Sequence, residues 1–97
     1  MQQMRDEQMS RRPEILIVDD AEFNREILKG FLGEAYCYSE AEDGNRAIQI
    51  LEENPEIDLM LLDINMPHMD GFEVLEWMNR SHRINTLPVI MISVEES

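Results

Sequence analysis

Short, continuous apolar runs alternate along this chain with segments whose apolar residues recur at helical spacing. The strong runs are "ILIV" at 15–18, "LMLL" at 59–62 and "VIMI" at 89–92, and a weaker run, "AYCYS", occupies 35–39. Runs of this length bounded by turn residues are typical of strands buried on both faces of a parallel sheet. The weaker run predicts an edge strand.

The segments between the runs predict amphipathic helices. Their apolar residues at helical spacing are, in chain order, Phe23, Ile27, Leu28, Phe31 and Leu32; then Ala47, Ile48 and Leu51; then Phe72, Leu75 and either Met78 or Trp77. The first stripe ends near Gly33, the second is closed by Asn54-Pro55, and the third starts just after Gly71. Strands alternating with helices indicate an open α/β sheet with right-handed crossovers.

The length of 97 residues corresponds to a single small domain. We expect residues 1–12, which are polar and unpatterned, to form a flexible leader, and residues 13–97 to form the domain. The leader lacks the apolar core of a signal peptide. No apolar stretch approaches the roughly 20 residues that a membrane span requires, so we expect no membrane insertion.

The charge balance indicates which partners are disfavoured, and the cysteine content indicates the redox compartment. Acidic residues number 21 against 8 basic ones, a formal net charge of −13. This excess disfavours binding to nucleic-acid phosphates and to anionic lipid surfaces. The single cysteine, Cys37, cannot form an internal disulfide, which fits a reducing cytoplasm, and we expect it to be a small core residue.

Each strong apolar run is followed by a polar residue that could bind a ligand. Asp19 and Asp20 follow the first run, Asp63 follows the second, and Ser93 follows the third. Parallel strands end on one edge of the sheet, where open α/β sheets bind ligands. Three clustered carboxylates require a cation, and an all-oxygen set favours Mg²⁺ over zinc. A spare carboxylate could attack phosphorus, although aspartates also occur at such places as helix caps.

Three motifs in order, "ILIVDD", "LMLLDINMPHMDG" and "PVIMIS", resemble the receiver domain of two-component response regulators. The resemblance runs from about Glu14 to Ser97. It implies an open, doubly wound parallel sheet of flavodoxin-like topology, here without the last helix, strand and helix. It also implies a bacterial, cytoplasmic signalling protein.

The resemblance assigns roles to individual residues. Asp63 matches the residue that accepts a phosphoryl group from a histidine kinase or phosphotransfer protein. Asp19 and Asp20 match the acidic pair that binds Mg²⁺, and Asn65 matches the residue that offers the metal its backbone carbonyl. Ser93 matches the hydroxyl that hydrogen-bonds the phosphoryl group.

The loop after Asp63 has its own assignments. The resemblance implies that Pro67 and Gly71 shape this loop, and glycine also tolerates turn dihedrals that other residues do not. We expect His68 in the loop to be exposed rather than a metal ligand, and His82 to lie at the surface.

The chain departs from the family pattern at its end. The family's phosphoryl-contacting lysine and the aromatic residue of its fifth strand have no counterpart, since the sole lysine is Lys29 in the first helical stripe, and Val94 stands where the family has a small residue. We therefore expect slow or unstable phosphorylation of Asp63. We also expect the open edge of the fourth strand to pair with a second copy, forming a homodimer.

Two other functions stay open at this point. One is an interaction fragment that docks to a kinase or another receiver without being phosphorylated. The other is a phosphatase with an aspartate nucleophile, but such enzymes use D-x-D, and Asn65 cannot act as the general acid. No nucleotide-binding glycine motif is present. We expect no enzymatic activity beyond transfer and loss of the chain's own phosphoryl group.

Overall fold

A computed structural model describes residues 12–64, 66 and 71–92 of the chain. The predicted leader lies outside the described residues except for Arg12, and its limits stay a prediction. Asn65, Pro67, His68 and Ser93 also lie outside them.

Strands and helices follow one another in the predicted order. The elements are β1 (Glu14–Val18), α2 (Glu22–Leu32), β2 (Cys37–Ala41), α3 (Gly44–Glu53), β3 (Leu59–Asp63), α4 (Gly71–Arg80), the short 3-10 helix η1 (Arg83–Asn85) and β4 (Val89–Ile92). The weak run forms a strand two residues later than predicted, because residues 35 and 36 belong to the turn before β2.

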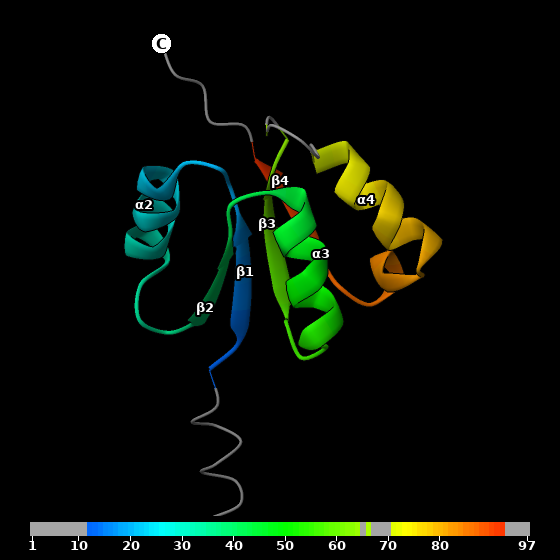
Figure 1. The fold of residues 1–97 in the computed structure, drawn as a ribbon. Helices are drawn as coiled ribbons and strands as arrows, with labels where there is room; N and C mark the ends of the chain where they lie inside the picture. The colour runs from blue at the N-terminus through cyan, green and yellow to red at the C-terminus, as the bar shows by residue number, and fades with distance from the viewer. Residues whose placement is uncertain (1–11, 65, 67–70, 93–97) are drawn as a thin grey trace, which may run out of the picture.

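The strands form one parallel sheet in the order β2-β1-β3-β4. Val18 at the end of β1 lies beside Ala41 of β2 and Leu62 of β3. Helix α2 covers one face of the sheet, while α3 and α4 cover the other (Figure 1). This is the open, doubly wound arrangement that the alternating pattern predicts, and it places the ends of β1 and β3 next to each other.

The core lies mainly between the sheet and the pair α3 and α4. Its sheet and helix residues are all buried: Leu16, Val18, Met60, Leu62, Ala47, Leu51, Val74 and Met78. A smaller cluster on the α2 side contains Ile15, Ile17 and Leu61, with Leu28 and Leu32 packed against it. The central strands β1 and β3 are therefore buried on both faces, as predicted for them.

The apolar positions of α2 are divided between the core and the surface. Leu28 and Leu32 pack against the sheet, whereas Phe23 and Phe31 are 74% and 88% exposed. Ile27 is also exposed. A helix lying on a sheet buries only one stripe of its surface, so the single stripe seen in the sequence does not form one buried face.

Two predictions of burial are wrong for the edges of the sheet. Strand β4 is not buried on both faces: Ile90 is 51% exposed, because it lies on the α2 side of an edge strand. Cys37 is half-buried rather than a core residue, because β2 is the other edge strand. None of the described helices is long and apolar enough to cross a membrane.

Candidate metal and phosphoryl-acceptor site

The carboxyl ends of β1 and β3 bring three aspartates together. Asp19 directly follows β1, and Asp63 is the last residue of β3, the neighbouring parallel strand. One carboxylate oxygen each from Asp19, Asp20 and Asp63 lies within 4.8 Å of the other two. Residues 44 positions apart in the chain (63 − 19) thus share one site because their strands are hydrogen-bonded neighbours.

The three carboxylates differ in their access to solvent. Asp19 is fully buried and Asp63 is 4% exposed, whereas Asp20 is exposed. Asp19 and Asp63 therefore form the floor of the site, and Asp20 lies at its open side.

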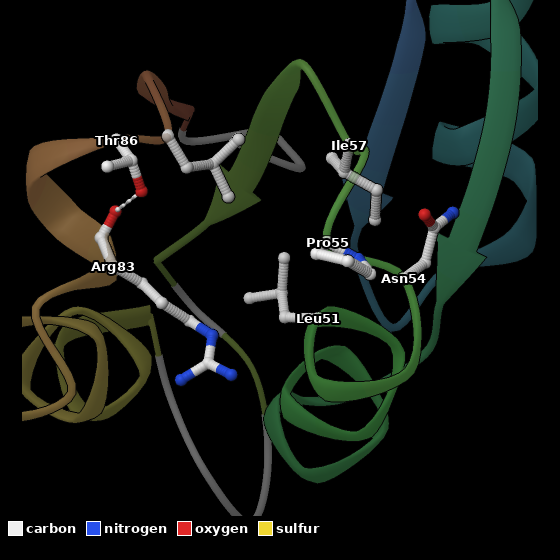
Figure 2. A pocket seen from close by; sticks show the side chains of 7 residues that line it. Leu51, Asn54, Pro55, Ile57, Arg83 and Thr86 are labelled. Carbon is white, nitrogen blue, oxygen red and sulfur yellow. Dashed lines mark hydrogen bonds between the residues drawn. The ribbon is translucent and has the colours of Figure 1, made fainter.

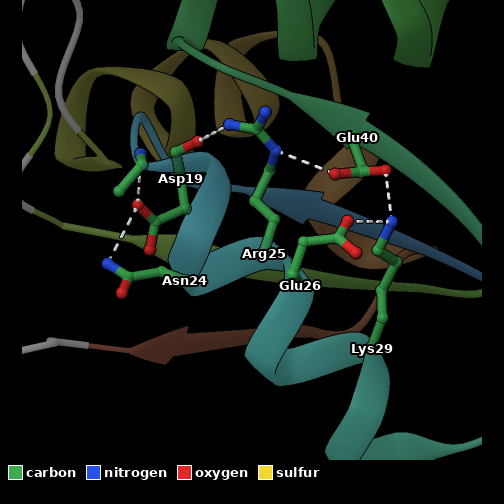
Figure 3. A network of polar contacts seen from close by, with 7 residues as sticks. Asp19, Asn24, Arg25, Glu26, Lys29 and Glu40 are labelled. Atoms are coloured by element: carbon green, nitrogen blue, oxygen red, sulfur yellow. Dashed lines mark hydrogen bonds and ion pairs between the residues drawn. The ribbon is translucent and has the colours of Figure 1, made fainter.

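Hydrogen bonds hold Asp19 in one orientation (Figure 3). Its Oδ1 accepts from the backbone N–H of Ala21 at 2.9 Å and, more weakly, from Asn24 Nδ2 at 3.5 Å. Its own N–H donates to the carbonyl of Ala41 at 3.0 Å, which extends the pairing of β1 with β2. Its Oδ2 is buried and has no hydrogen-bond partner among the described residues. Such an atom costs about 1–3 kcal/mol unless a ligand satisfies it.

Burial raises the pKa of Asp19 above its ordinary value of 3.8. The neighbouring charges of Asp63 and Asp20 raise this pKa further, while the hydrogen bonds from Ala21 and Asn24 oppose the shift. The fold thus confines negative charge at a place where ionisation is unfavourable, and a bound cation would remove that penalty.

The donor set fits Mg²⁺. All three side chains offer carboxylate oxygen, and neither His nor Cys belongs to the cluster. Mg²⁺ is commonly held by one or two carboxylates, with water and phosphate oxygens completing its shell. The partnerless Oδ2 of Asp19 is a further, independent observation in favour of a cation here.

Helix capping does not account for Asp19. Helix α2 begins after Ala21, which has no side-chain capping bond. A capping aspartate does exist elsewhere: Asp43 accepts from the N–H of Arg46 at 2.8 Å at the start of α3. The contrast separates a structural aspartate from those at the strand ends.

Gly71, the first residue of α4, lies against the end of β3. A Cβ on Gly71 would lie 2.8 Å from the carbonyl oxygen of Asp63 and 2.9 Å from Cα of Ile64. Its role is therefore close approach rather than an unusual dihedral, since Gly33 is the only described glycine with a left-handed φ, 86°. Tolerance of turn dihedrals, the reason expected from the sequence, does not explain the glycine at this position.

A hollow of about 150 Å³ lies at the opposite edge of the sheet, near the starts of β3 and β4 (Figure 2). The side chains that line it are Leu51, Asn54, Pro55, Ile57, Arg83, Thr86 and Leu87. Its only ionisable group is Arg83, whose guanidinium lies 4.8 Å from the ring centre of Trp77. A lining without a carboxylate cannot bind Mg²⁺ through charge, so the candidate chemistry belongs to the aspartate edge.

The polar residues that surround Asp19 outside the acidic cluster were not predicted from the sequence. Arg25 and Glu40 form a salt bridge beside Asp19, and Asn24 reaches its carboxylate (Figure 3). Nothing in the local pattern distinguishes Arg25 from a solvated helix residue. Its role depends on β2, which is distant in sequence and adjacent in space.

A parallel α/β sheet with an acidic cluster at its carboxyl edge fits a receiver-like domain. Residues 15–97 match the family described as the response regulator receiver domain. The chain belongs to this family, and its fold class agrees with the family's flavodoxin-like topology.

Similar proteins come from plants and bacteria. The chain is 31% identical over 84 residues to the two-component response regulator ORR5 of rice, covering 86% of this chain and 63% of that protein. It is 42% identical over 80 residues to response regulator RR06 of Streptococcus pneumoniae, covering 81% of this chain and 35% of that protein. The chain thus spans less than two thirds of the length of these relatives.

Solved structures show the same fold. A response regulator receiver protein from Pseudomonas putida superposes with a TM-score of 0.78 at 28% identity, covering 89% of this chain and 71% of that one. The chemotaxis protein CheY4 of Vibrio cholerae superposes with a TM-score of 0.76 at 29% identity, covering 89% and 72%. The open parallel sheet is therefore a property of the family.

Proposed function

We propose that this chain is a Mg²⁺-dependent phosphoacceptor in a two-component system, with Asp63 as the residue that is phosphorylated. The observation that carries the proposal is the placement of Asp63 at the end of β3, nearly buried and within 4.8 Å of Asp19 and Asp20. Receiver domains interact with histidine kinases or phosphotransfer proteins, and we propose a phosphohistidine of such a protein as the donor.

In the proposed reaction a carboxylate oxygen of Asp63 attacks phosphorus as the P–N bond to the donor histidine breaks. Asp20 and Asp63 would hold Mg²⁺ with Asp19 behind them, and the metal would offset charge on the phosphoryl oxygens. We also propose that Asn65 offers the metal its backbone carbonyl and that Ser93 donates a hydrogen bond to the phosphoryl group, as the resemblance of the sequence motifs implies. Pro67 and Gly71 would shape the intervening loop.

Phosphorylation with a small donor tests the proposal. Acetyl phosphate and Mg²⁺ should add one phosphoryl group to the chain in intact-mass spectrometry, and Asp63→Asn should abolish the addition. Asp43→Asn is the matched control, because asparagine also caps a helix and Asp43 lies at α3 rather than in the site. Labelling that persists in Asp63→Asn, or that is indifferent to chelation of Mg²⁺, contradicts the proposal.

Failure of any donor to label the chain would favour an interaction fragment that docks without phosphorylation.

We propose that the domain, residues 13–97, has no enzymatic activity beyond its own phosphoryl transfer and loss. The single cysteine supports a cytoplasmic location.

We also propose that two copies associate through β4. Two observations support this: β4 pairs only with β3 within the described part of the chain, and Ile90 is 51% exposed. An edge strand with free backbone groups and an apolar side chain favours pairing with another strand.

A further inference from the structure

We propose that Arg25, anchored by Glu40, is a positioning residue that fixes the turn carrying Asp19 and Asp20 in its metal-binding geometry. The inference rests on the proposed binding of Mg²⁺ and adds a residue that acts on the site through the backbone.

The guanidinium of Arg25 connects Asp19, the residue after β1, to Glu40 on strand β2 (Figure 3). Its Nη1 donates to the backbone carbonyl of Asp19 at 2.6 Å, and its Nε donates to Oε1 of Glu40 on β2 at 2.9 Å. The Arg25 side chain is 13% exposed. A planar fork that donates in two fixed directions suits this bridge, whereas an ammonium group is a single point of charge.

Glu40 is itself held in place. Its other oxygen, Oε2, accepts from Lys29 Nζ at 2.8 Å. The hydrogen bond from Lys29, followed by that from Arg25, lowers the pKa of Glu40 below its ordinary value of 4.5. The carboxylate that anchors Arg25 is therefore ionised at neutral pH.

The Asp19 carbonyl that accepts the hydrogen bond from Arg25 belongs to the peptide that links Asp19 to Asp20. Fixing this peptide limits the backbone rotation of Asp19, and so fixes where the next residue projects its carboxylate. The bond from Ala21 to Oδ1 of Asp19 holds the same turn from the side-chain end. Arg25 thus pre-organises a ligand set that would otherwise be spread by the repulsion of its own charges.

Electrostatics and positioning predict opposite effects when Arg25 is replaced. Arg25 is a cation beside a proposed cation site, so its charge alone weakens Mg²⁺ binding, and removing it would tighten binding. Positioning predicts the reverse, because loss of an outer-shell partner typically weakens metal binding by about 10–100-fold. The sign of the change therefore separates the two roles.

The test is a Mg²⁺ titration of the 97-residue chain followed by NMR amide shifts, with the Ala21 amide as the reporter of the turn. We expect Arg25→Met to weaken binding about tenfold. Lys29→Met is the matched control: it also removes a positive charge from Glu40 but makes no contact to Asp19. We expect it to leave the affinity within about twofold. The Ala21 amide should shift in metal-free Arg25→Met and not in Lys29→Met.

Arg25→Lys serves where Arg25→Met does not fold in thermal melts. It keeps the charge, so electrostatics alone predicts an unchanged affinity, whereas loss of the bridge predicts weaker binding. Equal or tighter binding by the Arg25 variants, or equal weakening by Lys29→Met, overturns the positioning role while leaving Mg²⁺ binding standing. A wild-type chain that binds no Mg²⁺ overturns the proposed function and this inference together.

Discussion

Gly71 lies so close to Asp63 that a single added carbon would reach its backbone: a Cβ on Gly71 would be 2.8 Å from the Asp63 carbonyl oxygen. The start of α4 is thereby held against the end of β3, the strand that presents the proposed phosphoacceptor. The glycine links the packing of a helix to the position of a functional side chain.

Gly71→Ala should therefore destabilise the chain by about 1–3 kcal/mol, because the contact is with backbone that cannot rotate away. It should also slow labelling of Asp63 by acetyl phosphate. Gly30→Ala is the control: Gly30 lies inside α2, and apart from its chain neighbours and the backbone of its own helix no described atom lies within 4 Å of an added Cβ, so alanine there should stabilise by about 0.5–1 kcal/mol. Urea melts compare the two, and a neutral Gly71→Ala would disprove the close contact.

Replacement of Asp19 should separate stability from metal binding. Asp19→Asn removes a buried negative charge whose Oδ2 has no hydrogen-bond partner among the described residues, so it should stabilise the metal-free chain by about 1–3 kcal/mol. That corresponds to a rise in Tm of roughly 4–8 °C per kcal/mol. The rise in Tm that Mg²⁺ produces in the wild type should be lost.

The gain from Asp19→Asn should depend on pH. Burial raises the pKa of Asp19 above 3.8, so its ionised form penalises folding at neutral pH, and the penalty is relieved as pH falls through the raised pKa. The gain should therefore be present at pH 7 and fade in acid. Asp20→Asn, at an exposed position, should lose the Mg²⁺ response and stabilise the metal-free chain less than Asp19→Asn does, because Asp20 is the smallest of the causes that raise the pKa of Asp19.

Glu40 should contribute stability with the opposite pH dependence. The pKa of Glu40 is lowered by Lys29 first and Arg25 next. The stabilisation is thus complete above its ordinary value of 4.5 and is lost as pH falls through the lowered pKa. Glu40→Gln should destabilise by about 1 kcal/mol or less at pH 7, since the group is partly exposed.

Melts of wild type and Glu40→Gln between neutral and acid pH test this. The difference between the two should shrink at the acid end, and Glu52→Gln, at an exposed position on α3, should show little difference at any pH. If the difference in stability between the wild type and Glu40→Gln stays constant as the pH falls, the stabilising ion pairs of Glu40 with Arg25 and Lys29 are contradicted.

Association through β4 should be sensitive to charge at Ile90. We expect a dimer at micromolar concentration in size exclusion with light scattering, and Ile90→Lys should shift it toward the monomer, because lysine on an edge strand opposes pairing. Phe31→Lys, on the exposed surface of α2, should leave the dimer intact. A monomeric wild type, or equal effects of both variants, would count against the β4 edge.

Much of the fold could be predicted from local pattern. The runs at 15–18, 59–62 and 89–92 are strands, and the order of helices and strands is as predicted. The reason is that buried strands and amphipathic helices each impose their own apolar spacing on the sequence. The aspartates could be singled out for a related reason: a charge that ends an apolar run is costly unless it has a use.

Strand pairing and helix packing determine which apolar residues are buried, and the apolar spacing of the sequence does not. The apolar spacing of α2 does not say that Leu28 packs against the sheet, partly buried, while Phe31 is exposed, because that depends on where the helix lies on the sheet. The apolar run at 89–92 likewise does not say that β4 is partly exposed, because the burial of a strand depends on its neighbours in the sheet.

The surroundings of the aspartates also required the tertiary structure. Sequence alone identified Asp19 and Asp63 as strand-end residues, but strand order placed them within 4.8 Å. The bridge from Arg25 to Glu40 and the approach of Gly71 to Asp63 join segments distant along the chain. Such contacts depend on the spatial order of strands and helices, and residue spacing along the chain carries no direct record of them.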